Sequence, residues 1–166
     1  GPGEISHQHH PTYLDNGRVL LFDNGAHRRG VNHSRVLEME PETNEIAWEY
    51  HGDPIISFYS YNISGAERQP NGNTLICEGA PGRIFEVTPQ GQIVWEYINP
   101  NFVPRVAGVV RNTEAGVATQ VQSSAEAELV NMTFRAHRYA ADHPALQDKD
   151  LDPARYGNLN RLYAVG

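Results

Sequence analysis

Short apolar or alternating runs, separated by turn-forming residues, dominate the chain as far as Pro100. Residues 18–22 are apolar after Arg18, which suits a strand buried on both faces, whereas residues 35–40 alternate between apolar and polar positions. Asn16-Gly17 favours a tight turn with positive φ. The pattern predicts a first set of four strands at residues 7–14, 18–22, 35–40 and 45–50.

The same pattern occurs twice. Asn16-Gly17 recurs as Asn71-Gly72 after 55 residues, and Trp48-Glu49-Tyr50 recurs as Trp95-Glu96-Tyr97 after 47 residues. The difference arises from a longer loop, residues 26–33, in the first repeat. The second set of strands is therefore expected at residues 59–69, 74–78, 83–88 and 92–97.

A repeat of roughly 40–50 residues built from short strands is typical of β-propeller blades. We predict an all-β fold in which residues 1–166 form one propeller segment, with blades at 7–50 and 59–97 and an irregular blade or tail at 98–166. Because blades bury their faces only against neighbours, two blades need others beside them. We expect a second polypeptide or self-association to complete the ring; an open two-blade domain is the alternative.

Beyond the second repeat the pattern weakens. Residues 106–110 and 158–165 can be strands, and residues 126–137 can be a strand pair or the start of a third blade. The small and polar residues 115–124 indicate an exposed loop, and residues 143–153, rich in Asp and Pro, indicate a surface excursion.

Composition narrows the function classes. The chain has 166 residues, of which 39% are hydrophobic and 20% charged, as in ordinary soluble domains. Its net charge of −7 argues against broad nucleic-acid binding. No apolar run reaches the ~18 residues that a membrane-spanning helix needs. The single cysteine, Cys77, excludes an internal disulfide, and its apolar surroundings predict a buried, inert thiol.

Histidines and arginines gather at the start of the first repeat and on its longer loop. His7, His9 and His10 lie on the expected inner strand, whereas Arg28 and Arg29 lie on the loop. Alternation along a strand puts His7 and His9 on one face and His10 on the other. Guanidinium and imidazole groups together suit an oxyanion such as sulfate, phosphate or carboxylate.

The same histidines permit a metal site as the rival interpretation. His7 and His9 would present two imidazoles on one side of a strand, as metal sites often do. No cysteine joins them, and neighbouring arginines repel a divalent cation. We therefore expect no metal or other cofactor, with a histidine–metal hydrolase or lyase as the alternative.

A second cluster lies in residues 134–139. If this stretch is extended, Arg135, His137 and Tyr139 share one face. A solvated edge strand is the alternative explanation. The acidic residues of the repeats are expected to be structural and to pair with Arg35, Arg83 or strand neighbours: Glu38, Glu40, Glu49, Glu86 and Glu96.

With these residues laid out, the chain resembles the arylsulfotransferase family of six-bladed propellers. The similarity covers most of residues 7–153. It is carried by Gln8-His9, the stretch 21–25 followed by Arg28, Ser34-Arg35 with Glu38, Trp48-Glu49-Tyr50, Tyr59-Ser60, and residues 64–78, 134–139 and 148–151.

The resemblance implies a six-bladed ring with an axial funnel in which a small aromatic anion is the substrate. In such enzymes a histidine attacks an aryl sulfate, and the resulting sulfohistidine passes the sulfuryl group to a phenol. Arginine and further histidines stabilise charge on the transferred oxygens.

Carried over residue by residue, the resemblance matches His9 to a family histidine and Arg28, or Arg29, to the arginine. No histidine lies between His51 and His137, so His137 or a further blade would have to supply a later nucleophile. The residues expected to be catalytic are His9, Arg28 and His137, and those expected to bind substrate are His10, Arg29 and Arg135.

A non-catalytic propeller that only binds a ligand or partner is the alternative from another function class, because fold does not fix function. The sequence leaves open which histidine is the nucleophile, which donor and acceptor are used, and the compartment, for which a secreted or periplasmic location is one option.

Overall fold

The protein is described here by a computed structural model that covers residues 5–105, 108–113, 116–121 and 128–156. Its architecture is all-β, and the described residues contain 3-10 turns but no α-helix. Two four-stranded antiparallel sheets follow each other along the chain, and the strands of each are hydrogen-bonded in sequence order. The first sheet comprises β1 (Gln8–Tyr13), β2 (Val19–Asp23), β3 (Arg35–Met39) and β4 (Ile46–Tyr50). The second comprises β5 (Gly65–Arg68), β6 (Thr74–Glu78), β7 (Arg83–Val87) and β8 (Ile93–Ile98).

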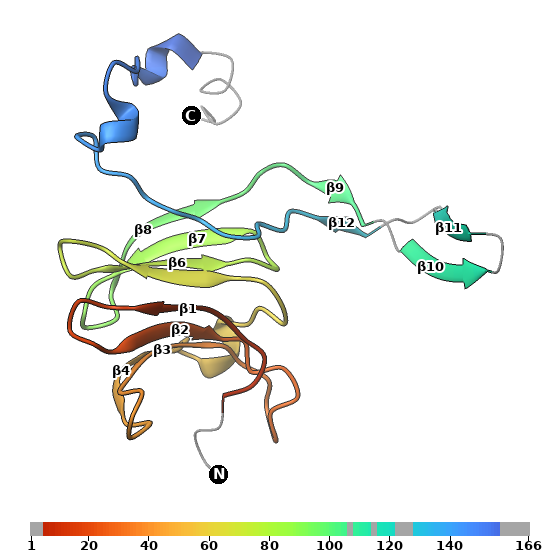
Figure 1. The fold of residues 1–166 in the computed structure, drawn as a ribbon, viewed down its shortest axis with the longest axis horizontal. Coiled ribbons are helices and arrows are strands. Elements are labelled where there is room, and N and C mark those ends of the chain that lie inside the picture. The colour runs from red at the N-terminus through yellow and green to blue at the C-terminus, as the bar shows by residue number, and fades with distance from the viewer. Residues whose placement is uncertain (1–4, 106–107, 114–115, 122–127, 157–166) are drawn as a thin grey trace.

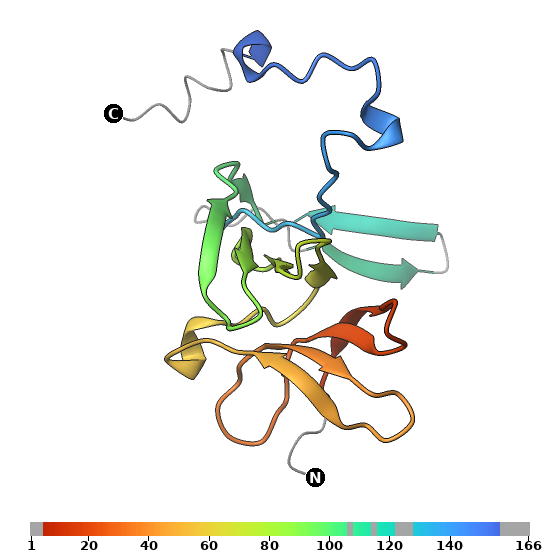
Figure 2. The same cartoon turned by 90° about the vertical axis from the view of Figure 1, so that its left-hand side faces the viewer.

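The two sheets stack as neighbouring layers (Figures 1 and 2) around one apolar core. Leu20, Phe22 and Val36 of the first sheet meet Ile76 and Phe85 of the second, and all five are fully buried. Three further buried members of this core are Tyr50, Phe58 and Val87. Burial of these large apolar side chains is the main force that holds the sheets together, at roughly 1.5–3 kcal/mol for each.

All eight strands form where the repeat predicts them, with one difference. β5 begins at Gly65 instead of residue 59, because the preceding stretch contains the 3-10 turn Ile55–Ser57 and positive φ angles at Ile63 and Ser64. Such angles lie outside the extended region that a strand requires. Cys77 on β6 is buried as expected, and burial raises the pKa of its thiol to about 11.

The chain beyond the second sheet holds β9 (Val103–Pro104), β10 (Gly108–Thr113), β11 (Gly116–Val121) and β12 (Leu129–Val130). β9 pairs with β12, and the β10–β11 hairpin projects from the two sheets as a separate arm (Figure 1).

Beyond the second sheet, some of the sequence-based predictions are confirmed and others are wrong. The loop expected at residues 115–124 is wrong over residues 116–121, where β11 pairs with β10; Val117 and Thr119 are β-branched residue types that favour strands. The stretch 126–137 contains only the two-residue strand β12 among its described residues. Residues 143–153 lie largely exposed, as predicted, and contain the 3-10 turn Pro144–Leu146; a second, Pro153–Tyr156, follows. The strand expected at 158–165 lies outside the described residues.

An arginine joins the two sheets beside their core. Arg68 at the end of β5 bonds Glu38 on β3 at 2.6 Å, and its guanidinium lies 4.7 Å from the centre of the Trp48 ring on β4. Trp48 in turn donates its indole N–H to the carbonyl of Pro89, between β7 and β8. We call Glu38, Arg68 and Trp48 the first clamp.

The same arrangement occurs a second time on the next layer. Arg138 bonds Glu86 on β7, and its guanidinium lies 4.9 Å from the ring centre of Trp95 on β8. Glu86 pairs with Trp95 in the register as Glu38 pairs with Trp48. We call Glu86, Arg138 and Trp95 the second clamp. Residues 134–138 therefore contact the second sheet as β5 contacts the first, on the side away from the first sheet (Figure 1).

The outer strand of the second sheet is less covered than its equivalent. Every residue of β8 is exposed, and Val94, Trp95 and Ile98 retain 55, 43 and 50% of their accessible surface. On β4, Trp48 is half-buried under Arg68, and Tyr50 is buried against Phe58. The side chains of β4 are more buried than those of β8 because a complete sheet lies beside β4, whereas a single extended segment lies beside β8.

Replacing Arg68 with alanine is expected to lower the free energy of unfolding by about 2 kcal/mol, because the change removes an ion pair to a buried carboxylate and a cation–π contact. Arg138→Ala is the matched control and should cost about half as much, since the Arg138 side chain is 37% exposed and that of Arg68 is 19% exposed. Urea unfolding followed by tryptophan fluorescence measures both; equal losses would contradict the proposed difference between the clamps.

Candidate functional site

Three of the six predicted site residues, His10, Arg135 and His137, lie where β1, β5 and residues 134–138 meet. The ring of His10, on β1, lies edge to face with the ring of His137, with 5.8 Å between their centres. Gly65 makes this approach feasible, because a Cβ at that position would lie 2.6 Å from the Nδ1 of His10. Histidines separated by 127 positions along the chain thus form one cluster.

His10 points into this cluster because the backbone changes direction there. The φ angle of His10 is 54°, and the register between β1 and β2 shifts between His9 and Thr12. A bulge of this kind redirects side chains that regular alternation would place otherwise. His9 consequently turns to Asn24, whereas His10 turns to Gly65 and His137.

The environment of His10 favours the neutral imidazole. Its Nδ1 is buried and has no hydrogen-bond partner within the described part of the chain. Burial first, then the positive charge of Arg135 and that of His137 when it is protonated, lower the pKa of His10 below its usual 6.5, while the negative charge of Glu67 raises it. His10 is therefore ready to accept a proton or a hydrogen bond at neutral pH.

Arg135 and His137 reach the cluster from the same extended stretch. Arg135 lies over the ring of Phe134 at 5.2 Å, and its Nε is buried without a partner among the described residues. His137 Nδ1 lies 2.9 Å from a carboxylate oxygen of Glu67 on β5. Both residues lie near enough to His10 for their charges to lower its pKa. Tyr139, expected on the same face, contacts the ring of His143 at 4.8 Å, and the structure assigns no strand here.

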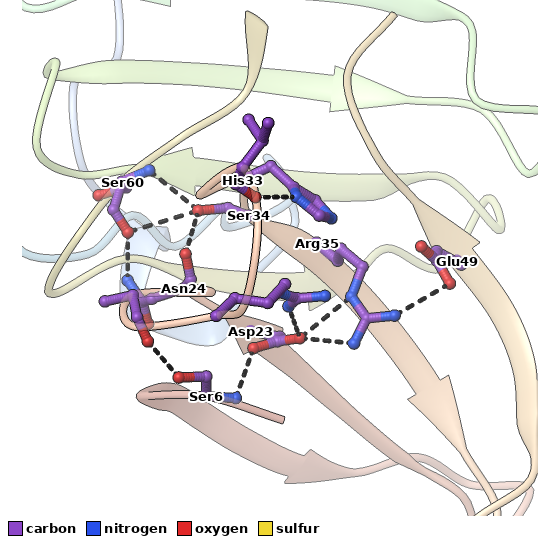
Figure 3. Close-up of polar contacts among 11 residues, drawn as sticks. Ser6, Asp23, Asn24, His33, Ser34, Arg35, Glu49 and Ser60 are labelled. Carbon is purple, nitrogen blue, oxygen red and sulfur yellow. Dashed lines mark hydrogen bonds and ion pairs between the residues drawn. The ribbon is translucent and has the colours of Figure 1, made fainter. Parts of the chain in front are cut away.

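His9 belongs to a buried polar network beside this cluster. Its Nδ1 lies 2.7 Å from the side-chain oxygen of Asn24, which is fully buried. The amide nitrogen of Asn24 donates to the carbonyls of Ser60 and Ile63, and Ser34 donates its hydroxyl to the carbonyl of Asn24. Figure 3 shows Asn24, Ser34 and Ser60 joined in this way. The network fixes His9 against the linker between the two sheets.

Arg28 is engaged with a buried carboxylate. Asp23, which is fully buried, accepts from Arg28 at 2.5 Å. It also accepts from Arg35 at 2.7 Å and from the backbone N–H of Ser6 at 2.9 Å (Figure 3). The charge of Arg28 therefore compensates that of Asp23 and holds the loop to β2. Arg29 lies exposed on the same loop.

The acidic residues of the outer strands pair with arginines, as expected for structural groups. Arg35 lies between Asp23 and Glu49 on the first sheet. Arg83 lies between Glu78 and Glu96 at the equivalent place on the second.

The structure thus brings together His10, Arg135 and His137, and it places His9, Arg28 and Arg29 in other surroundings. Glu67 is the functional candidate that the sequence analysis missed. The sequence shows only that Glu67 and Gln69 alternate with Arg68 and so share one face of a strand; the contact of Glu67 with His137 is visible in the tertiary structure alone.

No family model, no curated protein and no solved structure matches the chain. The candidate site is therefore defined by its own geometry and by the chemistry of its side chains.

Two features bear on the alternative of a histidine–metal site, and a third concerns the membrane. No group of three or more His, Cys, Asp or Glu side chains in the described residues is arranged to hold a metal ion. The ring of His7 lies 5.0 Å from that of His27, whereas Nδ1 of His9 lies near Asn24 and the backbone carbonyl of His7, so the two imidazoles make separate contacts. Within the same residues, no helix has the length and apolar character needed to cross a membrane.

An open cavity of about 730 Å³ lies between the sheets at their turn ends, away from these histidines. It is lined by residues that include Tyr13, Arg18, Trp48 and Arg68. Both arginines already bind Glu38, so the carboxylate of Glu38 partly neutralises the positive charge of the cavity lining.

An NMR titration should give His10 a pKa below 6.5 in the folded protein. Arg135→Gln should raise this pKa, because it removes a neighbouring positive charge, but it should not restore the full value, because burial remains the larger cause. Arg18→Gln, which removes a charge from the turn end, is the control and should leave His10 unchanged. A pKa for His10 that ignores Arg135 would contradict the geometry of the cluster.

Proposed function

We propose that this protein is a β-propeller segment that transfers a sulfuryl group from an aryl sulfate to a phenol. The observation that supports this most directly is the convergence of His10, Arg135 and His137 from distant parts of the chain. An arginine beside two imidazoles matches the needs of an oxyanion that must be both bound and transferred. The family resemblance of the sequence points to the same chemistry.

Arg135 is the group that would bind the sulfate oxygens. Its Nε is buried without a partner in the described chain, so a ligand oxygen would satisfy it. The exposed ring of Phe134 lies against the same guanidinium and would offer an apolar surface for the aryl group.

In the first step, the Nε2 lone pair of His137 attacks the sulfur of the bound aryl sulfate. The bond between sulfur and the aryl oxygen breaks, and the aryl oxide leaves with the electron pair. The product is a sulfohistidine whose ring carries a positive charge and whose sulfuryl group carries a negative one. Arg135 stabilises the charge that develops on the sulfuryl oxygens.

In the second step, the oxygen of a phenol attacks the sulfur and the bond between Nε2 and sulfur breaks, returning the electron pair to His137. The phenolic proton passes to neutral His10, which then releases it to water. Because its surroundings lower the pKa of His10, this base stays available below pH 6.5.

The propeller assignment rests on the two clamps. The first joins two complete sheets, and the second joins the second sheet to residues 134–138, which occupy the position that an inner strand of a further blade would take. The exposed side chains of β8 would be covered by the remaining strands of that blade. Another polypeptide or another copy of this chain would supply them.

Turnover of 4-nitrophenyl sulfate with phenol as acceptor tests the proposed activity. His137→Ala should lower kcat by about 1,000-fold or more, and His10→Gln by about 100-fold. His51→Ala, a matched change at an exposed histidine, should leave turnover unchanged. If the protein binds sulfate but the wild type releases no nitrophenol, the site is a binding site only, as in a non-catalytic propeller.

Light scattering coupled to size exclusion tests the propeller assignment. The purified chain should appear heavier than 18.5 kDa, through self-association or a co-purified polypeptide, because the apolar face of β8 needs a cover. Trp95→Arg should reduce that mass. A monodisperse 18.5 kDa species with one cooperative melting transition would show that the two sheets are a complete domain.

A further inference from the structure

Glu67 stands out because it is the carboxylate that contacts the histidine cluster. One oxygen lies 2.9 Å from Nδ1 of His137, and the same side chain acts on His10 as a negative charge. Asp23 and Glu86, by contrast, are bound by arginines. The repeat does not predict a carboxylate at this position. Glu67 pairs with Leu75 in the second sheet, and the residue that pairs with the equivalent Leu20 in the first sheet is Thr12.

A second side chain holds Glu67 in place. The side-chain amide of Gln69, which is 7% exposed, donates to the other carboxylate oxygen at 3.2 Å and to the backbone carbonyl of Glu67 at 3.3 Å. Arg68, between them, points the opposite way into the first clamp. The carboxylate is therefore oriented from both sides, although its side chain remains 30% exposed.

We propose that Glu67 is a positioning residue that keeps the proton of neutral His137 on Nδ1 and so leaves the lone pair on Nε2. A carboxylate can only accept a hydrogen bond, so the nitrogen that faces it must be the protonated one. Free imidazole has no such constraint. The chemical use of this tautomer rests on the proposed sulfuryl transfer, in which Nε2 is the attacking atom.

Glu67 also has an electrostatic role in that reaction. When Nε2 bonds to sulfur, the imidazole ring becomes positively charged while Nδ1 keeps its proton. The Glu67 carboxylate beside Nδ1 stabilises this charge, whereas Arg135 stabilises the sulfuryl oxygens. The two opposite charges thus act on the two ends of the same intermediate, and no further proton donor is needed for the first step.

Nitrogen-15 NMR of the imidazole rings tests the tautomer without any substrate. In the wild type at a pH where His137 is neutral, the shifts should identify Nδ1 as protonated and Nε2 as unprotonated. Glu67→Ala should move His137 toward a mixture of both forms, with His51 as an internal reference that does not change. A His137 tautomer unaffected by Glu67→Ala would overturn the proposal.

Kinetics separate positioning from binding. Glu67→Ala should lower kcat for nitrophenyl sulfate by about 100-fold while KM changes by less than about 3-fold, because the substrate contacts Arg135 and not Glu67. Glu67→Asp should recover part of the loss, since it retains the acceptor. Glu42→Gln, which removes one negative charge from an exposed turn, is the matched control. Unchanged kcat in Glu67→Ala would overturn the role in catalysis.

The two proposals can fail separately. If wild type shows the Nδ1–H tautomer and Glu67→Ala loses it, but neither protein turns over an aryl sulfate, the positioning by Glu67 stands and sulfuryl transfer is wrong. If turnover depends on His137 but the tautomer does not respond to Glu67, sulfuryl transfer stands and the positioning role is wrong. Circular dichroism of each variant confirms that the sheets are intact.

Discussion

The direction of two arginine side chains determines how the candidate site is built. Arg68 and Arg138 each lie between a carboxylate and an indole of the preceding layer. Because neighbouring residues in an extended chain point to opposite sides, fixing these arginines directs Glu67 and His137 away from the clamps and toward each other. An interaction that stabilises the stacking of layers therefore also sets the geometry of the histidine and its carboxylate partner.

Charge is distributed unevenly between the two places where histidines and arginines gather. Around Asp23, two arginines and a backbone N–H surround one fully buried carboxylate, so the group is compensated internally and has a structural role. Around His10, one arginine and two imidazoles accompany the carboxylate of Glu67. The buried Nδ1 of His10 and Nε of Arg135 lack partners in the described chain, as does the Nε of Arg28 beside Asp23. The second environment is the one suited to receive an anion from solution.

The repeat in the sequence located the eight strands of the two sheets except for the start of β5, and the residue types alone singled out His10, Arg135 and His137 as candidates. It did not reveal the left-handed backbone at His10, which is an unusual conformation for a non-glycine residue and separates His10 from His9. β11 was missed because small and polar residues conceal its strand character. Glu67 was missed because its importance depends on His137, 70 residues later, which only the tertiary structure brings beside it.

The arm between β9 and β12 has a consequence for how such a chain can diversify. The chain leaves the two stacked sheets after β9 and returns to them at β12. At this point the backbone N–H of Arg105 donates to the carbonyl of Glu128, and the two side chains form an ion pair at 3.0 Å. Since the ends of the excursion are already joined, its length adds only a slowly growing entropic cost. Insertions or grafted modules at this junction would leave the register of residues 131–138 against the second sheet unaltered, which makes it a natural position for domain insertion.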